Sequence, residues 1–311
     1  MPLDPKAKAL LTAIIAAGDP AIDTLPVEVA RRNIDSRYAQ MRTPVSSVDS
    51  IRNIEIPGPG GNIPLRIYAP PGNGPFPVVV YFHGGGWVLF GLDSYDSICT
   101  HLCNEAHCII VSVAYRLAPE NKFPAASDDC LWATEWVFNY IAGFNGDPAK
   151  VFIAGDSAGG NLSAVTCLRL RDKNGPEPAG QVMLYPVTDY YEPETKSYHE
   201  LGDDYILTRK DMIWFWDQYL ADPVDSHNPY VAPLKVSSCK RLPPALILVS
   251  AYDPLLDEGL AYGEKLRNDG IPVNISVYED MMHGFLSYLG ILKQAKTAIE
   301  EISAWIKKTA K

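Results

Sequence analysis

A serine in the middle of the chain lies between small residues, an arrangement in which it could act as a nucleophile. The β-branched run at 151–154 precedes it and a helical pattern follows, which predicts a tight reversal from strand to helix. Such a reversal crowds the backbone, needs small neighbours, and places the serine at the N-terminus of the helix. The pattern is GxSxG, formed by Gly155, Asp156, Ser157, Ala158 and Gly159. The bare pattern often arises by chance, whereas this context favours a nucleophilic Ser157.

A serine nucleophile needs a general base, and the base needs a third group to orient it. Among the six histidines, His283 alone follows the last predicted strand, and Gly284 beside it lets the loop bend. Asp253 follows another strand, and the proline after it restricts the turn. The nearby Asp257 and Glu258 have a structural explanation, because acidic residues favour the first turn of a helix. The resulting order of serine, aspartate and histidine is that of α/β-hydrolases.

Three consecutive glycines, Gly84, Gly85 and Gly86, follow the strand expected at 78–82. Glycines there cost conformational entropy, and their use is close approach of the backbone to a ligand. Their N–H groups and that of Ala158 would form an oxyanion hole, in which one donor is worth roughly 10²–10³ in rate. His83 before them is expected to support the loop by hydrogen bonding, with a role as base as the alternative. His101 and His107 are expected to be structural, and His199 and His227 stay open as substrate neighbours.

The elements that must position these residues alternate between strands and helices from about residue 50. Apolar runs without polar alternation, separated by helices, predict a mostly parallel sheet covered on both faces. The expected strands are 63–69, 78–82, 109–114, 151–154, 181–185, 245–250 and 273–278. The expected helices are 94–106, 126–142, 158–172, 257–268 and 291–308.

Two regions fall outside this alternation, and we interpret them as one helical cap over the carboxyl ends of the strands, where α/β sheets bind ligands. They are residues 1–48 and an aromatic-rich insertion at 188–222, which divide the α/β core into 49–187 and 223–311. The alternative is that they only extend the hydrophobic core. The residues expected in the substrate pocket are Trp87, Phe90, Trp214, Phe215 and Phe285.

Composition narrows the functional classes. The net charge of −10 and the lack of a Lys/Arg cluster give no electrostatic support to nucleic-acid binding. No apolar run approaches the roughly 20 residues of a membrane span, so no stable membrane insertion is expected. The six cysteines lack metal-ligand spacing, so no metal site is predicted and buried free thiols are favoured over disulfides. Residues 1–20 fit an amphipathic helix better than a signal peptide, which favours a cytoplasmic location.

With these motifs together, residues 50–311 resemble the hormone-sensitive-lipase-like (family IV) carboxylesterases. The matching segments are 83–87 (HGGGW), 115–120 (YRLAPE), 123–126 (FPAA), 155–161 (GDSAGGN), 253–255 (DPL) and 283–285 (HGF). The resemblance implies an eight-stranded α/β-hydrolase sheet, no cofactor, and oxyanion donors at Gly85, Gly86 and Ala158. One departure is Leu256, where the family usually has arginine, which puts a local salt bridge in doubt but not the assignment.

The predicted function is hydrolysis of short- to medium-chain acyl esters by a Ser157–His283–Asp253 triad through an acyl-enzyme. The alternatives are a lipase, an amidase, or a non-catalytic small-molecule receptor on the same fold, such as the plant gibberellin receptor, which lacks the histidine. The predicted partner is a small ester. The resemblance also implies a homodimer, which the apolar face of the last helix could form, and the alternative is that this face only covers its own sheet.

Overall fold

The computed structural model of the protein describes residues 1–41 and 44–311. A single β-sheet forms the centre of the molecule. Among these residues, eight strands follow the order β1-β2-β4-β3-β5-β6-β7-β8. Strands β1 and β2 pair antiparallel, β2 is antiparallel to β4, and the others are parallel. The bounds are β1 Ser50–Gly58, β2 Gly61–Ala69, β3 Phe76–Phe82, β4 Ile109–Val113, β5 Gly146–Asp156, β6 Gly180–Leu184, β7 Ala245–Tyr252 and β8 Val273–Met282.

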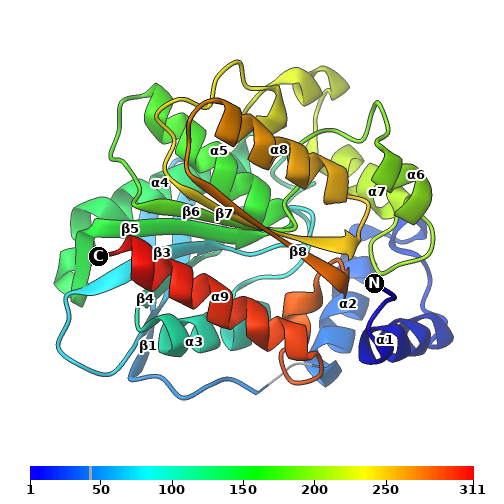
Figure 1. Ribbon diagram of the computed structural model, residues 1–311, viewed down its shortest axis with the longest axis horizontal. Helices are drawn as coiled ribbons and strands as arrows, with labels where there is room; N and C mark the ends of the chain where they lie inside the picture. Colours follow the sequence, from blue (N-terminus) through cyan, green and yellow to red (C-terminus); the bar gives the residue numbers. More distant parts are fainter. Residues whose placement is uncertain (42–43) are drawn as a thin grey trace.

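Helices cover both faces of this sheet (Figure 1). Helices α3 and α9 lie on one face, and α4, α5 and α8 lie on the other. Side chains of β3 alternate accordingly: Val78 and Val80 join one hydrophobic cluster, and Val79 joins the second. Both faces of the sheet are therefore buried under helices, which is why polar and apolar residues hardly alternate along the strands. The bounds are α3 Leu92–Ala106, α4 Ala125–Tyr140, α5 Ala158–Asp172, α8 Leu256–Asn268 and α9 Lys293–Thr309.

The predicted α/β-hydrolase architecture is confirmed, and the expected strands and helices are found within a few residues of their predicted bounds. The structure adds β1, which the sequence analysis missed. This strand lies at the edge of the sheet and exposes most of its side chains, so it lacks the continuous apolar run that marked the others.

The regions before residue 49 and after residue 187 contribute helices at the carboxyl end of the parallel strands (Figure 1). They are α1 Pro5–Ala16, α2 Val27–Met41, α6 Lys196–Leu201 and α7 Arg209–Tyr219. Short 3-10 helices complete the fold: η1 Ile22–Thr24, η2 Ile141–Phe144, η3 Pro223–His227, η4 Pro233–Lys235 and η5 Phe285–Tyr288. Helix α7 contacts η1, so the two regions, remote in sequence, meet. In the part of the chain described, no helix is long and apolar enough to cross a membrane.

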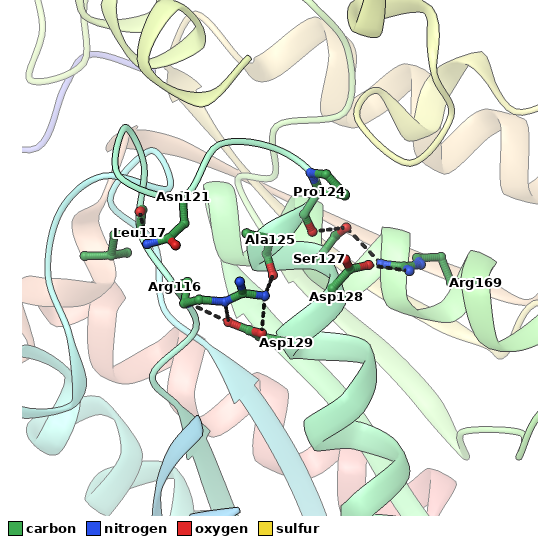
Figure 2. Close-up of polar contacts among 9 residues, drawn as sticks. All are labelled: Arg116, Leu117, Asn121, Pro124, Ala125, Ser127, Asp128, Asp129 and Arg169. Atoms are coloured by element: carbon green, nitrogen blue, oxygen red, sulfur yellow. Dashed lines mark hydrogen bonds and ion pairs between the residues drawn. The ribbon is translucent and has the colours of Figure 1, made fainter. Parts of the chain in front are cut away.

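A loop at residues 115–124 is anchored to the core by Arg116 (Figure 2). The Arg116 guanidinium donates to both carboxylate oxygens of Asp129 on α4 at 2.8 Å, and the Arg116 backbone N–H donates to the same carboxylate at 2.9 Å. Asp129 is 1% exposed, and this bidentate partner supplies the hydrogen bonds that a buried carboxylate needs. Next to it, Arg169 of α5 donates to Ser127 and Asp128 of α4 (Figure 2).

The same loop holds both regions that lie outside the alternation. From α2, Arg31 donates to the carbonyl oxygen of Ala118 at 2.7 Å and pairs with Glu120. From the loop, the Lys122 ammonium donates to two carbonyl oxygens at the end of α7, both at 2.7 Å. The Phe123 N–H also donates to the Tyr219 carbonyl at 2.8 Å. Loop 115–124 therefore bridges α2, α7 and the core.

Candidate active site

Ser157 occupies the reversal between β5 and α5, with φ 54° and ψ −119°. This left-handed conformation is strained for a residue with a side chain, and the neighbouring glycines make it possible. A Cβ on Gly159 would lie 1.9 Å from the Phe82 carbonyl oxygen, and one on Gly155 would lie 2.4 Å from that of Gly159. The Ser157 N–H donates to the Leu184 carbonyl of the neighbouring strand at 2.9 Å, which holds the turn against the sheet.

The three residues of the expected triad lie within hydrogen-bond distance of one another. His283 Nε2 is 3.0 Å from Ser157 Oγ, and His283 Nδ1 is 2.7 Å from Asp253 Oδ2. The Leu255 N–H donates to the other carboxylate oxygen of Asp253 at 2.9 Å. Ser157 and His283 are each 8% exposed and Asp253 is 0% exposed. Asp253 is thus fully buried behind two residues that line the cavity, where its carboxylate can hold the orientation of the imidazole.

The amides expected to bind an oxyanion surround this serine, with one difference. Gly85 and Gly86 line the cavity in front of Ser157, have φ 101° and 59°, and their N–H groups have no hydrogen-bond partner among the described residues. Ala158 opens α5, so its N–H is unpaired within the helix. The Gly84 N–H is instead bonded to Tyr95 and Asp156, at 2.9 and 3.1 Å. Gly84 therefore anchors the loop and is not available as a donor.

Asp156, next to the nucleophile, accepts the hydrogen bonds that hold this glycine loop. Its Oδ1 accepts from the Tyr81 hydroxyl at 3.0 Å and from Gly84, and its Oδ2 accepts from the Tyr95 hydroxyl at 2.8 Å. Burial raises the pKa of Asp156 from 3.8 to about 6, against the opposing effect of these donors. The sequence analysis missed this network because Asp156 appeared there only as a variable position of the pattern.

His83 supports the glycine loop as predicted from its position. Its Nδ1 lies 2.8 Å from the Gly84 carbonyl, and its ring stacks on Tyr115 with 4.3 Å between centroids. Burial lowers the pKa of His83 to about 4, so the ring is neutral at pH 7. The ring does not line the cavity at Ser157, and these contacts favour support of the loop over a role as a base.

The other histidines lie away from Ser157. His101 Nδ1 donates to the Ser97 carbonyl oxygen of its own helix at 2.7 Å, and His107 packs against Phe76. His199 is 3.2 Å from Glu194 and exposed, and His227 is exposed on η3. Neither His199 nor His227 lines the cavity at Ser157.

A cavity of about 890 Å³ opens over Ser157 and His283. Its walls come from α1, η1, α2, the glycine loop, and the segment from 203 to α7. Of the aromatic residues expected there, Phe90 and Phe215 line the cavity. The Phe215 ring packs on Gly86 so closely that a Cβ on this glycine would be 2.1 Å from it.

Trp87, Trp214 and Phe285 do not lie on this wall, contrary to expectation. Trp87 is fully buried and stacks on Tyr219 with 4.2 Å between centroids. Phe285 is also fully buried and packs on Tyr278 on the other face of the sheet. Trp214 joins the core cluster on the opposite side. Trp87 and Phe285 were expected in the pocket because they follow HGGG and His283 in the sequence. Such proximity does not determine whether a ring points into the cavity or into the core. In place of these three, Tyr38, Leu89, Ile206 and Leu207 line the cavity.

Among residues 1–41 and 44–311, no group of three or more His, Cys, Asp or Glu side chains is arranged so that it could hold a metal ion. The acidic residue Glu258 that follows Asp253 is structural. Its Oε1 accepts from the Thr188 and Asp189 N–H groups, and burial raises its pKa well above the usual range.

Comparison with known proteins decides the family. A model of the α/β-hydrolase fold matches residues 79–287. The chain belongs to the α/β-hydrolase family. The chain is 40% identical to the carboxylic ester hydrolase LipN of Mycobacterium tuberculosis over 295 residues, 92% of this chain and 77% of that protein. It is 33% identical to the ethyl acetate hydrolase of Pseudomonas putida over 307 residues, 95% of each chain.

Solved structures agree with this assignment to the α/β-hydrolase family. The hyperthermophilic esterase of the archaeon Pyrobaculum calidifontis superposes with a TM-score of 0.94 at 37% identity, over 100% of this chain and 99% of that one. The resemblance to the hormone-sensitive-lipase-like carboxylesterases is confirmed, and so is the predicted enzyme class, carboxylic ester hydrolase.

Proposed function

We propose that this α/β-hydrolase cleaves short- to medium-chain acyl esters with Ser157 as nucleophile, His283 as general base and Asp253 as the orienting acid. The observation that carries the proposal is the continuous chain of contacts from Ser157 Oγ through both imidazole nitrogens to Asp253, at 3.0 and 2.7 Å. With Nδ1–H donated to the buried carboxylate, Nε2 is left as the acceptor that a serine nucleophile needs.

The reaction proceeds in two acyl transfers. Ser157 Oγ bonds to the ester carbonyl carbon while its proton moves to His283 Nε2, and the N–H groups of Gly85, Gly86 and Ala158 stabilise the oxyanion. The carbon–oxygen bond to the alcohol breaks as His283 returns the proton to the leaving oxygen. A water molecule then attacks the acyl-enzyme, gives one proton to His283 and releases the acid, and the proton returns to Ser157.

Residues 1–48 and 188–222 act as a cap that shapes the substrate site. Support comes from the cavity wall, to which α1, η1, α2 and α7 all contribute above the serine. Aromatic and aliphatic side chains such as Leu89, Phe90 and Phe215 line the cavity together with charged residues, and a small ester is the substrate we expect there in preference to a lipid. The presence of His283 disfavours the receptor alternative. A cytoplasmic location and a homodimer remain predictions from sequence.

The test is the initial rate on p-nitrophenyl esters from acetyl to palmitoyl, with Ser157→Ala measured alongside. Turnover should be highest for short chains and should fall by about 10⁵-fold or more in the variant. Ser303→Ala is the matched control, because Ser303 is a buried serine on α9, far from the site, and should leave the rates unchanged. In addition, an organophosphonate should add its mass to wild type and not to Ser157→Ala.

Several results would contradict this proposal. Undiminished hydrolysis by Ser157→Ala would exclude Ser157 as the nucleophile. Faster cleavage of the palmitoyl ester would identify a lipase. No turnover of any ester by folded wild-type protein would favour the receptor.

A further inference from the structure

A second cavity lies beside the catalytic one, and the two have a wall in common. The catalytic cavity has a volume of about 890 Å³ and its neighbour about 620 Å³. Tyr38 of α2 and Phe90 of the glycine loop line both. The remaining lining of the second cavity comes from α2, β2 and the start of α3: Asp35, Ala39, Pro64, Arg66, Gly91, Leu92, Asp93, Ser94 and Ala114.

The shared wall is a pair of aromatic rings in contact. The ring centroids of Tyr38 and Phe90 are 4.5 Å apart and their planes are inclined by 52°. Each ring is supported from behind: Phe90 packs edge-on against Tyr95 at 6.1 Å, and Tyr38 lies 6.3 Å from Tyr288. Both rings are partly buried, which is what a partition exposed to a cavity on either side would show.

One ring of the partition, that of Phe90, contacts a residue of the proposed oxyanion hole. A Cβ on Gly85 would meet the Phe90 ring at 2.7 Å, so this ring lies directly on one of the two glycines proposed to bind the oxyanion. Phe90 also has φ 70°, a left-handed conformation that is rare for an aromatic residue, and the turn around it is closed by the Val88 and Leu89 N–H groups, which donate to the Gly85 carbonyl. Strain of this kind persists only where the surrounding structure enforces it.

Both sides of the partition combine apolar and polar groups. The catalytic side includes the aliphatic and aromatic side chains of Ile34, Leu89 and Phe215, and charged residues such as Asp19, Arg37 and Lys210 also line it. The far side combines small apolar surface from Pro64, Leu92 and Ala114 with the polar groups of Asp35, Arg66 and Ser94. An acyl chain that passed the partition would therefore find further apolar surface on the far side.

We propose that the Tyr38–Phe90 ring pair is a specificity-determining partition that limits the length of the acyl chain by separating the catalytic cavity from its neighbour. The inference rests on the proposed ester hydrolysis at Ser157 and names the residues that set its chain-length limit. One ring comes from the N-terminal helix and one from the core, so either can be removed independently of the other.

The test is the ratio of kcat/KM for p-nitrophenyl decanoate to that for p-nitrophenyl butyrate. Phe90→Ala and Tyr38→Ala should each raise this ratio by roughly tenfold, the gain from burying about two more methylene groups. Because Phe90 also touches Gly85, its removal can lower all rates, and the ratio corrects for this. Tyr38→Ala opens the same partition while the contact between Phe90 and Gly85 stays in place, so it decides the outcome if Phe90→Ala does not fold.

Two control variants separate an opened partition from other changes. Tyr38→Phe retains the ring and should keep the wild-type ratio whatever its absolute rate. Leu207→Ala enlarges the catalytic cavity away from the second one, since Leu207 lines only the catalytic cavity, and should change the ratio less than threefold.

Either of two results would overturn the partition. The first is an unchanged ratio in Tyr38→Ala, and the second is an equal increase in Leu207→Ala, which would show that added volume anywhere is sufficient. If wild type hydrolyses neither ester, the proposed function itself fails; if wild type is active and the ratio does not move, only the partition fails.

Discussion

The carboxyl edge of the sheet and the side of the cavity formed by the proposed cap are stabilised in different ways. At the edge, the side chains proposed for catalysis lie on turns whose backbone is bonded to neighbouring strands, as with the Ser157 N–H and the Leu184 carbonyl, and their partners are buried. On the cap side, Tyr38, Leu207 and Phe215 define the wall by side-chain packing. Polar links from α2 and α7 to the core run through loop 115–124.

Because the two regions are stabilised differently, we expect substitutions in them to affect different properties of the enzyme. Backbone hydrogen bonds and close glycine contacts hold the atoms of the edge in place, so changes there should abolish chemistry. Packed side chains set only the shape of a space, so changes on the cap side should alter which substrate is preferred and how tightly it is bound.

After Ser157→Ala, the largest effect is expected from Asp253→Asn. An amide in place of the carboxylate would favour the wrong imidazole tautomer, and kcat should fall by about 10⁴-fold with the fold retained. The measurement is kcat on p-nitrophenyl butyrate together with circular dichroism.

Asp257→Asn is the matched control for this prediction. Asp257 lies four residues further on and bonds to the Ser197 N–H, so its variant should keep kcat within about threefold. A larger loss in Asp257→Asn than in Asp253→Asn would reassign the acid.

A smaller effect, on stability and its pH dependence, is expected from Asp156→Asn. The pKa of Asp156 is about 6 in the folded protein instead of 3.8, because burial disfavours the charged form. The folded protein therefore holds this proton more tightly than the unfolded chain, so the free energy of unfolding of wild type falls as pH rises from about 4 to 6 and levels off above. The asparagine has no proton to lose, so it should become more stable relative to wild type by roughly 3 kcal/mol across that window.

Urea unfolding of both proteins at pH 4, 5, 6 and 7 measures this change. Parallel curves for the two proteins would show that Asp156 does not titrate in this range, and a gap that widens toward low pH would reverse the sign of the argument.

The smallest effect is expected on the cap side, from Arg31→Ala. Arg31 donates to the carbonyl oxygens of Val88 and Ala118, at 2.8 and 2.7 Å, and its ion pair with Glu120 is half exposed and contributes little. Its removal should lower the free energy of unfolding by about 1.5 kcal/mol and raise KM several-fold, with kcat within about twofold.

Arg267→Ala on α8 is the comparison for Arg31. Its partner Glu264 is exposed and on the same helix, so the loss should stay below about 0.5 kcal/mol. Equal losses in the two variants would mean that Arg31 is an ordinary surface residue, and a loss of kcat instead of KM would mean that the cap acts on the chemistry.

The sequence was sufficient for the parts governed by local rules. Strands buried on both faces have continuous apolar runs, and the reversal at Ser157 needs Gly155 and Gly159, so both could be recognised without the structure. Asp253 and His283 followed from their positions after strands, since the carboxyl ends of parallel strands meet at one edge.

The parts governed by tertiary packing were not accessible in this way. Trp87 follows the glycines as closely as Phe90 does, yet one ring points into the core and the other into the cavity, and sequence spacing does not distinguish them. Tyr38 is one of many residues on a helix of mixed polarity and became significant only when α2 was seen beside the glycine loop. The partners of Asp156 lie more than sixty residues away along the chain.

Loop 115–124 has a consequence for the exchange of parts between relatives. The loop is hydrogen-bonded to α2 through Arg31 and to α7 through Lys122, and Arg116 of the loop pairs with Asp129 of α4. In a chimera that receives α2 and α7 from another esterase while keeping its own loop, the α2 attachment survives only if the new helix carries an arginine at this position, and the α7 attachment survives only if the new helix ends where its carbonyl oxygens reach Lys122. The unit of modular exchange in this protein is therefore three segments, with the loop transplanted together with the two helices it carries.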